Sequence, residues 1–125
     1  MHAPITAFYA GLLGVLMLVL AFRVVAVRRS TSIGLGDGGN ALLLTRIRIH
    51  GNAAEYVPLA LLLMLMLEIN GASSGFLNFL GLALVIGRVA HAQGLTTSNG
   101  VSPGRLVGNV LTWSVILIAA IRNVI

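Results

Sequence analysis

The chain has 125 residues, of which 58% are hydrophobic and 9% are charged, and its formal net charge is +5. A soluble domain carries about 25% charged residues, so this composition excludes a soluble globular protein and predicts an integral membrane protein. Cysteine is absent, which excludes disulfides, a thiolate metal site and a cysteine nucleophile. No metal site is expected.

Four apolar segments follow one another along the chain, each near the length of about 20 residues that a helix needs to cross a bilayer. They cover residues 5–27, 41–69, 75–92 and 103–121. Backbone groups inside a bilayer must be satisfied within the protein, so these segments are expected to be helices. We therefore expect an all-α, integral membrane four-helix bundle that forms a single domain over residues 1–125.

The first apolar segment is followed, not preceded, by arginines, which is unlike a cleaved signal peptide and favours a retained anchor. The polar link after it contains Gly34, Gly36 and Gly39 in the spacing of a dinucleotide-binding fingerprint. That motif requires a strand before it and a helix after it in a βαβ unit. Because a membrane anchor precedes it here, an ordinary flexible loop is the favoured interpretation.

The second apolar segment contains a stripe of polar side chains. Arg48, Asn52 and Glu55 stand at i, i+4 and i+7, on one face of a helix, with Tyr56 beside them. An ionisable side chain in a membrane segment costs about 2.5 to 3.5 kcal/mol, so it is retained mainly where it lines a cavity or meets a partner. The stripe suits an elongated zwitterionic ligand. In the alternative, Arg48 and Glu55 neutralise each other while Asn52 holds helices together.

Further polar residues lie on the second and third segments. Arg88 and His91, at i and i+3, form a second polar pair, and two polar helix faces at one depth indicate a binding site. Glu68, near the outer end of its segment, is expected to be solvated at the membrane surface, and Arg46 is expected to extend to the lipid head groups. His50 adjoins the stripe but faces away from it.

All eight basic residues are arginine. If the four helices alternate in direction, seven of the arginines fall on one side of the membrane: Arg23, Arg28, Arg29, Arg46, Arg48, Arg88 and Arg105. The positive-inside rule places that side in the cytoplasm and both termini on the other side. The arginines are scattered at helix ends and only 6% of residues are aromatic, so nucleic-acid binding is not expected.

Two motifs carry a resemblance to a known family. They are R-x-H-x-N-x-x-E-Y-x-P at residues 48–58 and G-R-x-x-H-x-Q-G at residues 87–94. With its length, its four segments and its long first loop, the chain resembles the membrane-associated proteins in eicosanoid and glutathione metabolism, the MAPEG family. The resemblance implies a homotrimer of four-helix subunits that binds glutathione at each subunit interface. It also implies conjugation of the glutathione sulfur to apolar electrophiles, or reduction of lipid hydroperoxides.

The resemblance further implies roles for individual residues. Positions that hold glutathione in the family are matched here by Arg48, His50, Asn52, Glu55, Tyr56 and Arg88. Arg28 or Arg29 looks like an arginine that reaches in from the neighbouring subunit, and Arg105 looks like the arginine that stabilises the thiolate. His91 and Leu95 stand where similar glutathione-using members have tyrosines, so part of that clamp is changed.

The charges of the stripe match those of glutathione, which carries two carboxylates and one ammonium. Arginine binds carboxylates bidentately, and Glu55 is suited to the ammonium. A free thiol of pKa about 8.5 is only about 3% thiolate at pH 7, and a nearby arginine in a partly desolvated site favours the thiolate.

We therefore expect a glutathione-dependent transferase or peroxidase of the inner membrane that self-associates, with an apolar substrate arriving from the bilayer. Two other classes stay open. One is a non-enzymatic lipid-binding or scaffold protein of the same fold. The other is a small proton-coupled exporter that depends on Glu55.

Overall fold

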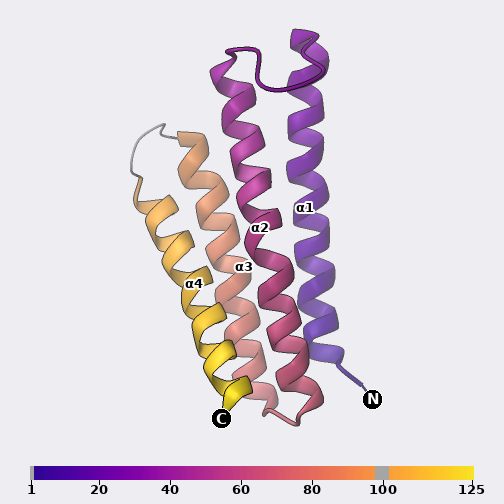
Figure 1. Cartoon of the computed structure of the whole chain (residues 1–125), viewed down its shortest axis with the longest axis vertical. Helices are drawn as coiled ribbons and strands as arrows, with labels where there is room; N and C mark the ends of the chain where they lie inside the picture. The colour runs from indigo at the N-terminus through magenta and orange to yellow at the C-terminus, as the bar shows by residue number, and fades with distance from the viewer. Residues whose placement is uncertain (1, 98–101) are drawn as a thin grey trace.

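The computed structural model describes residues 2–97 and 102–125, which form four helices and no strand (Figure 1). The helices are α1 (Pro4–Thr31), α2 (Ala41–Ile69), α3 (Ser74–Thr97) and α4 (Pro103–Val124). All four are long and apolar enough to cross a membrane. The expected all-α architecture of four membrane-spanning helices is thereby confirmed, whereas the trimer stays a prediction.

The helices extend further than the apolar segments that predicted them. α1 continues to Thr31 and α3 to Thr97, because helical hydrogen bonding persists after the apolar run ends. Hydroxyl groups support both ends, since Thr31 Oγ1 donates to the carbonyl of Val27 and Thr96 Oγ1 donates to that of Ala92. The polar residues 96–104 favour a link from the sequence alone. Because α3 continues to Thr97, this link is shorter, and its residues 98–101 lie outside the described part of the chain.

The glycine-rich link joins two helices. Gly34 follows α1, and Gly36, Gly38 and Gly39 take positive φ angles before α2 begins. Residues 2–97 contain no strand that could precede this motif. The dinucleotide-binding interpretation is therefore excluded, and the loop interpretation holds.

The bundle has one end that is rich in arginine. α1 and α3 run toward this end, whereas α2 and α4 begin there and run back (Figure 1). We call it the arginine end and define it by Arg28, Arg29, Arg46 and Arg105, which lie in the last turn of α1, the second turn of α2 and the first turn of α4. The core between the helices is built from fully buried apolar side chains, among them Ile49, Met64, Leu80, Leu84 and Val115.

α3 and α4 approach each other through glycine. A Cβ atom added to Gly108 would lie 2.5 Å from the carbonyl oxygen of Gly87 and 2.6 Å from Cβ of His91. A Cβ added to Gly94 would lie 2.5 Å from the backbone nitrogen of Arg105. Small residues allow membrane helices to pack at short distance, so these glycines set the position of the first turns of α4 against α3.

At the opposite end of the bundle, Glu68 caps α1. Its Oε1 accepts a hydrogen bond from the backbone N–H of Ile5 at 2.9 Å, and its Oε2 accepts one from that of Thr6 at 2.7 Å. These amides belong to the first turn of α1, where they have no partner inside the helix and where the helix dipole favours an anion. The expectation that Glu68 is simply solvated was wrong, because the start of α1 lies within reach of the end of α2.

We predict that Glu68→Gln lowers the free energy of unfolding by about 1 to 2 kcal/mol, since it removes the charge and one of the two acceptor oxygens. The thermal unfolding midpoint in detergent, followed by circular dichroism, measures this effect. Asp37→Asn is the matched control, because the Asp37 carboxylate accepts a hydrogen bond from the nearby N–H of Gly39 in an exposed loop. Equal midpoints for the two variants would contradict the capping role.

Candidate functional site

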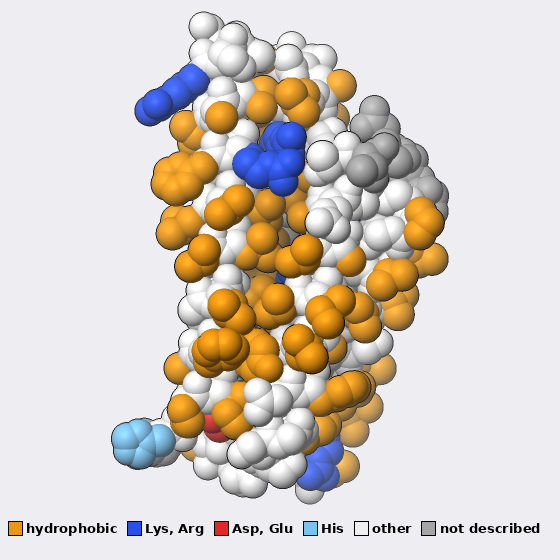
Figure 2. All heavy atoms as spheres, turned by 180° about the vertical axis from the view of Figure 1, so that it is seen from behind, with side chains coloured by type: hydrophobic (Ala, Val, Ile, Leu, Met, Phe, Trp, Pro, Cys, Tyr) orange, Lys and Arg blue, Asp and Glu red, His pale blue; other side chains and the backbone are white. Residues whose placement is uncertain are grey.

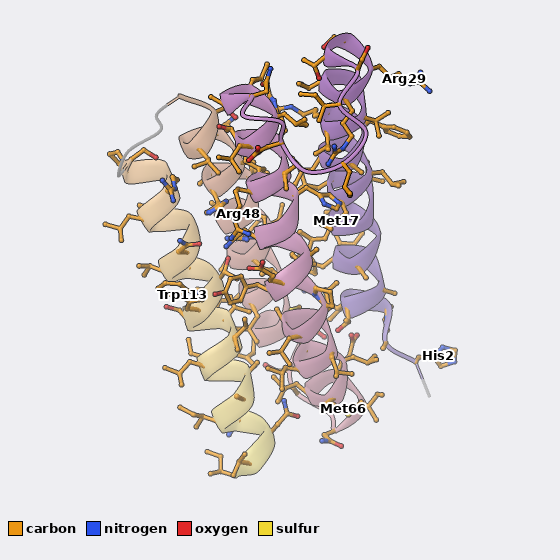
Figure 3. The ribbon with its side chains drawn as sticks, turned by 45° about the horizontal axis from the view of Figure 1, so that its top comes forward. His2, Met17, Arg29, Arg48, Met66 and Trp113 are labelled. Carbon is orange, nitrogen blue, oxygen red and sulfur yellow. The ribbon has the colours of Figure 1, made fainter. Side chains whose placement is uncertain are left out.

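Two members of the polar stripe on α2 form an exposed ion pair. Arg48 Nη1 lies 3.7 Å from Glu55 Oε1, and the two side chains are 57% and 53% exposed in the isolated subunit. Figure 3 shows Arg48 on the side of α2 that faces α4. At this distance the pair balances charge without a short hydrogen bond, so both groups stay accessible to a ligand.

The third member of the stripe points to a partner inside the bundle. Asn52 Oδ1 accepts a hydrogen bond of 2.7 Å from Arg88 Nη1, and Arg88 Nη2 donates to the carbonyl of Gly108 at 3.4 Å. Arg88 is only 2% exposed. Its guanidinium therefore connects α2, α3 and α4, and part of the stripe serves the packing of the bundle.

His91 lies one turn beyond Arg88 and is also buried, at 4% exposure. Its backbone and Cβ lie where Gly108 brings α4 closest to α3. The second polar pair predicted from the sequence therefore lies in the core of the subunit. That Arg88 and His91 contact a ligand stays a prediction.

Tyr56 contacts an aromatic residue of α4. Its ring and that of Trp113 are 6.3 Å apart between centroids, at an interplanar angle of 64°, in an edge-to-face arrangement. Such a pair is worth about 0.5 to 1.5 kcal/mol beyond its burial. It holds α4 beside the polar stripe, at the level of Glu55.

Two of the predicted arginines line one cavity at the arginine end. The cavity has a volume of about 360 Å³, within the range of about 300 to 1,000 Å³ typical of small-molecule sites. Arg48 of α2 and Arg105 of α4 supply its cationic groups. The rest of its wall is mainly apolar and consists of Ala41, Leu44, Thr45 and Leu95.

Arg105 is positioned by the cap of α4. The hydroxyl of Ser102 accepts from the backbone N–H of Arg105 at 3.3 Å and donates to the carbonyl of Gly94 at 2.8 Å. Ser102 followed by Pro103 predicts a helix start from the sequence alone, and the structure confirms that Ser102 caps α4. Because the same hydroxyl also bonds α3, Arg105 is fixed relative to both helices in the first turn of α4.

Arg28 and His50 lie together at a different place. They line a cavity of about 350 Å³ between α1 and α2, with Gly51 beside them. Arg28 Nη1 also donates to the carbonyls of Ile33 and Gly36 at 3.2 and 2.9 Å, which closes the loop after α1. Arg29 is exposed and points away from the bundle (Figure 3), so within one subunit Arg28 is the one that lines a cavity.

Several features of this region were not predicted from the sequence. Arg46 was expected to reach the head groups, but its Nη1 is buried and makes no hydrogen bond to any described residue. Asn109, one turn after Arg105, carries a buried Oδ1 that likewise has no partner in residues 2–97 and 102–125. The bond between Asn52 and Arg88 was also not predicted, although a buried guanidinium needs an acceptor. Within residues 2–97 and 102–125, no cluster of three or more His, Cys, Asp or Glu side chains could hold a metal ion.

A family model describes almost the whole chain. Residues 6–125 match the model of the MAPEG family. The chain belongs to the MAPEG family. It is 37% identical over 119 residues to the inner membrane protein YecN of Escherichia coli strain K12, a match that covers 95% of this chain and 89% of that relative. YecN of Escherichia coli O6:H1 strain CFT073 matches to the same extent. No solved structure matches the chain.

We predict that Asn52 and Arg88 are energetically coupled. Asn52→Leu leaves a buried guanidinium without its acceptor, and Arg88→Met leaves an amide without its donor, so each single change costs about 1.5 to 3 kcal/mol. In the double variant no group is left unpaired, and the loss is smaller than the sum of the two single losses. Unfolding free energies of the four proteins in detergent measure the coupling. Additive losses would contradict the buried connection.

Proposed function

We propose that this MAPEG-family protein is a glutathione-dependent membrane transferase or peroxidase, which conjugates glutathione to apolar electrophiles or uses it to reduce apolar hydroperoxides. The observation that carries the proposal is the cavity that Arg48 and Arg105 line together. The two arginines come from α2 and α4, so the fold brings together residues that are far apart in the sequence.

The chemistry of this cavity fits the tripeptide. A guanidinium donates two parallel hydrogen bonds to a carboxylate, and the cavity has two guanidinium groups for the two carboxylates or for one carboxylate and the thiolate. Glu55, 3.7 Å from Arg48, supplies an anion for the ammonium group. The apolar part of the wall, with Leu44 and Leu95, suits an electrophile that arrives from the lipid.

Arg105 is placed to favour the thiolate. It lies in the first turn of α4, where the positive end of the helix dipole lowers the pKa of a nearby thiol. Its own positive charge acts in the same direction. In the transferase reaction the thiol proton leaves to water, the sulfur forms a bond to the electrophilic carbon, and the leaving group departs with its electron pair.

The second cavity supports a site shared between subunits. The cavity with Arg28 and His50 lies between α1 and α2, whereas the cavity with Arg48 and Arg105 lies between α2 and the α3–α4 pair. We propose that, in a homotrimer, the cavity of Arg28 and His50 in one subunit faces the cavity of Arg48 and Arg105 in its neighbour. Arg28 and His50 would then complete the glutathione site from the neighbouring subunit.

The proposed location is the inner membrane. The relative YecN is named an inner membrane protein, and the four helices of this chain are suited to crossing a bilayer. The positive-inside rule places the arginine end in the cytoplasm and both termini on the other side. Glutathione would then reach the cavity from the cytoplasm.

A non-enzymatic lipid-binding or scaffold role is the second candidate. It is favoured by the burial of Arg88 and His91, because α3 then contributes little polar surface to a ligand. The two functions differ in one measurable property, which is glutathione-dependent turnover of an apolar electrophile.

We predict that the purified protein binds glutathione saturably and conjugates it to a chlorodinitrobenzene substrate. Arg48→Ala weakens binding about tenfold or more, because a charge-assisted hydrogen bond is lost. Arg105→Ala lowers kcat more than it raises KM and shifts the pH profile of kcat to higher pH, because the thiolate loses its stabilisation. Calorimetry and steady-state kinetics give these values.

Arg122→Ala is the control, since Arg122 lies in the last turn of α4 at the opposite end of the bundle. It should leave binding and turnover unchanged. Binding without turnover in the wild-type protein would favour the non-enzymatic role. Absence of saturable binding would contradict the proposal altogether.

A further inference from the structure

A separate groove lies between α1 and α3. It has a volume of about 490 Å³, which is within the range of small-molecule sites. It shares no lining residue with the cavities described above. Its wall consists of Leu16, Val19, Leu20 and Arg23 of α1 and Val89, Ala92, Gln93 and Thr96 of α3. Figure 2 shows this side of the molecule, where basic side-chain atoms lie among apolar side chains in the upper half.

The groove is polar at one end and apolar along the rest of its length. α1 and α3 run in the same direction (Figure 1), so the later residues of both lie nearer the arginine end. Arg23, Gln93 and Thr96 are these later residues, whereas Leu16 and Val89 begin the apolar part. Leu16 is about 10 Å below Arg23 along the helix axis. The groove therefore suits an amphipathic molecule with its polar group toward the arginine end.

Arg23 is the cation of this groove. Its side chain is half-buried, and within residues 2–97 and 102–125 it forms no hydrogen bond or ion pair. It lies about 12 Å before the end of α1, well inside the apolar helix. Arg28 and Arg88 differ, because their guanidinium groups donate to carbonyl or amide oxygens. A guanidinium at such a depth is stabilised by an anion.

The chain itself offers little to neutralise Arg23. It has three acidic residues: Glu55 pairs with Arg48, Glu68 caps α1 at the opposite end, and Asp37 accepts from Gly39 in the loop after α1. A second copy of the chain packed on this face would therefore offer only side-chain carboxylates that already have partners within their own chain. The bilayer, in contrast, supplies acyl chains and phosphate groups together.

We propose that the groove between α1 and α3 is a binding site for an anionic phospholipid. Arg23 holds the phosphate of the headgroup, with Gln93 and Thr96 beside it. One acyl chain lies along Leu16, Val19 and Val89. Basic pockets between membrane helices bind anionic lipid headgroups in this way. The site is independent of the proposed glutathione chemistry, because it lies on another face and uses other residues.

The test measures lipid retention by native mass spectrometry. The protein is purified in mild detergent that contains equal amounts of palmitoyl-oleoyl phosphatidylglycerol and palmitoyl-oleoyl phosphatidylcholine, and the amounts of the two lipids that stay bound are compared. The wild-type protein should retain phosphatidylglycerol in preference to phosphatidylcholine. Arg23→Gln should lower that preference about fivefold, the factor that corresponds to about 1 kcal/mol per basic residue. Arg23→Lys should keep most of it. Arg29→Gln is the matched control, because Arg29 is exposed on the same helix.

A second pair of variants tests where the acyl chain lies. Val19→Trp fills the groove and should reduce retention of both lipids, whereas Val15→Trp, at an exposed position of α1 outside the groove, should not. Equal retention of the two lipids by the wild-type protein, or equal losses in the Arg23→Gln and Arg29→Gln variants, would overturn the proposal. A Val19→Trp variant that has a different oligomer mass but retains both lipids as before would also overturn the proposal, because a second copy of the chain would then cover the groove.

Discussion

The structure depends on where the buried guanidinium of Arg88 finds its hydrogen-bond acceptors. Arg88 lies in the middle of a membrane helix at 2% exposure, where water cannot solvate it and an unpaired charge is costly. The amide oxygen of Asn52 and the carbonyl of Gly108 accept hydrogen bonds from its two Nη atoms, whereas its buried Nε has no partner among residues 2–97 and 102–125. One acceptor comes from α2 and the other from α4, so satisfying Arg88 fixes three helices relative to one another.

This requirement explains the composition of the contact between α3 and α4. The carbonyl of Gly108 reaches Arg88 only because α4 lies very close to α3, and a side chain at Gly108 would collide with Gly87 and His91. The same close contact continues to Gly94 and Arg105 at the arginine end. Placement of Arg105 at the cavity is thus a consequence of the packing that satisfies Arg88. Arg88 supports the bundle, whereas Arg48 and Arg105 are left to line a cavity.

Much of the fold was predictable from the sequence, because hydropathy and chain length determine membrane helices almost alone. The four helices, the caps at Ser102 and the loop around Gly36 followed from local patterns. Helical spacing also placed Arg48, Asn52 and Glu55 on one face, but it did not show that Asn52 turns inward to Arg88 while the other two stay exposed. That division depends on which helix lies opposite, and the sequence of α2 does not contain this information. The cap that Glu68 provides for α1 and the groove beside Arg23 were missed for the same reason, since each joins segments that are far apart in the chain.

The central claim is that the cavity of Arg48 and Arg105 binds glutathione, and the absence of cysteine permits a direct measurement. Thr45 lines this cavity and Thr96 lines the groove between α1 and α3, so Thr45→Cys and Thr96→Cys each introduce one reactive thiol at a chosen site. The rate of maleimide labelling is measured with and without S-hexylglutathione, which has no free thiol of its own. The account predicts that the ligand slows labelling of Thr45→Cys in a saturable way and leaves Thr96→Cys unaffected. Unchanged labelling of Thr45→Cys at all ligand concentrations would contradict it.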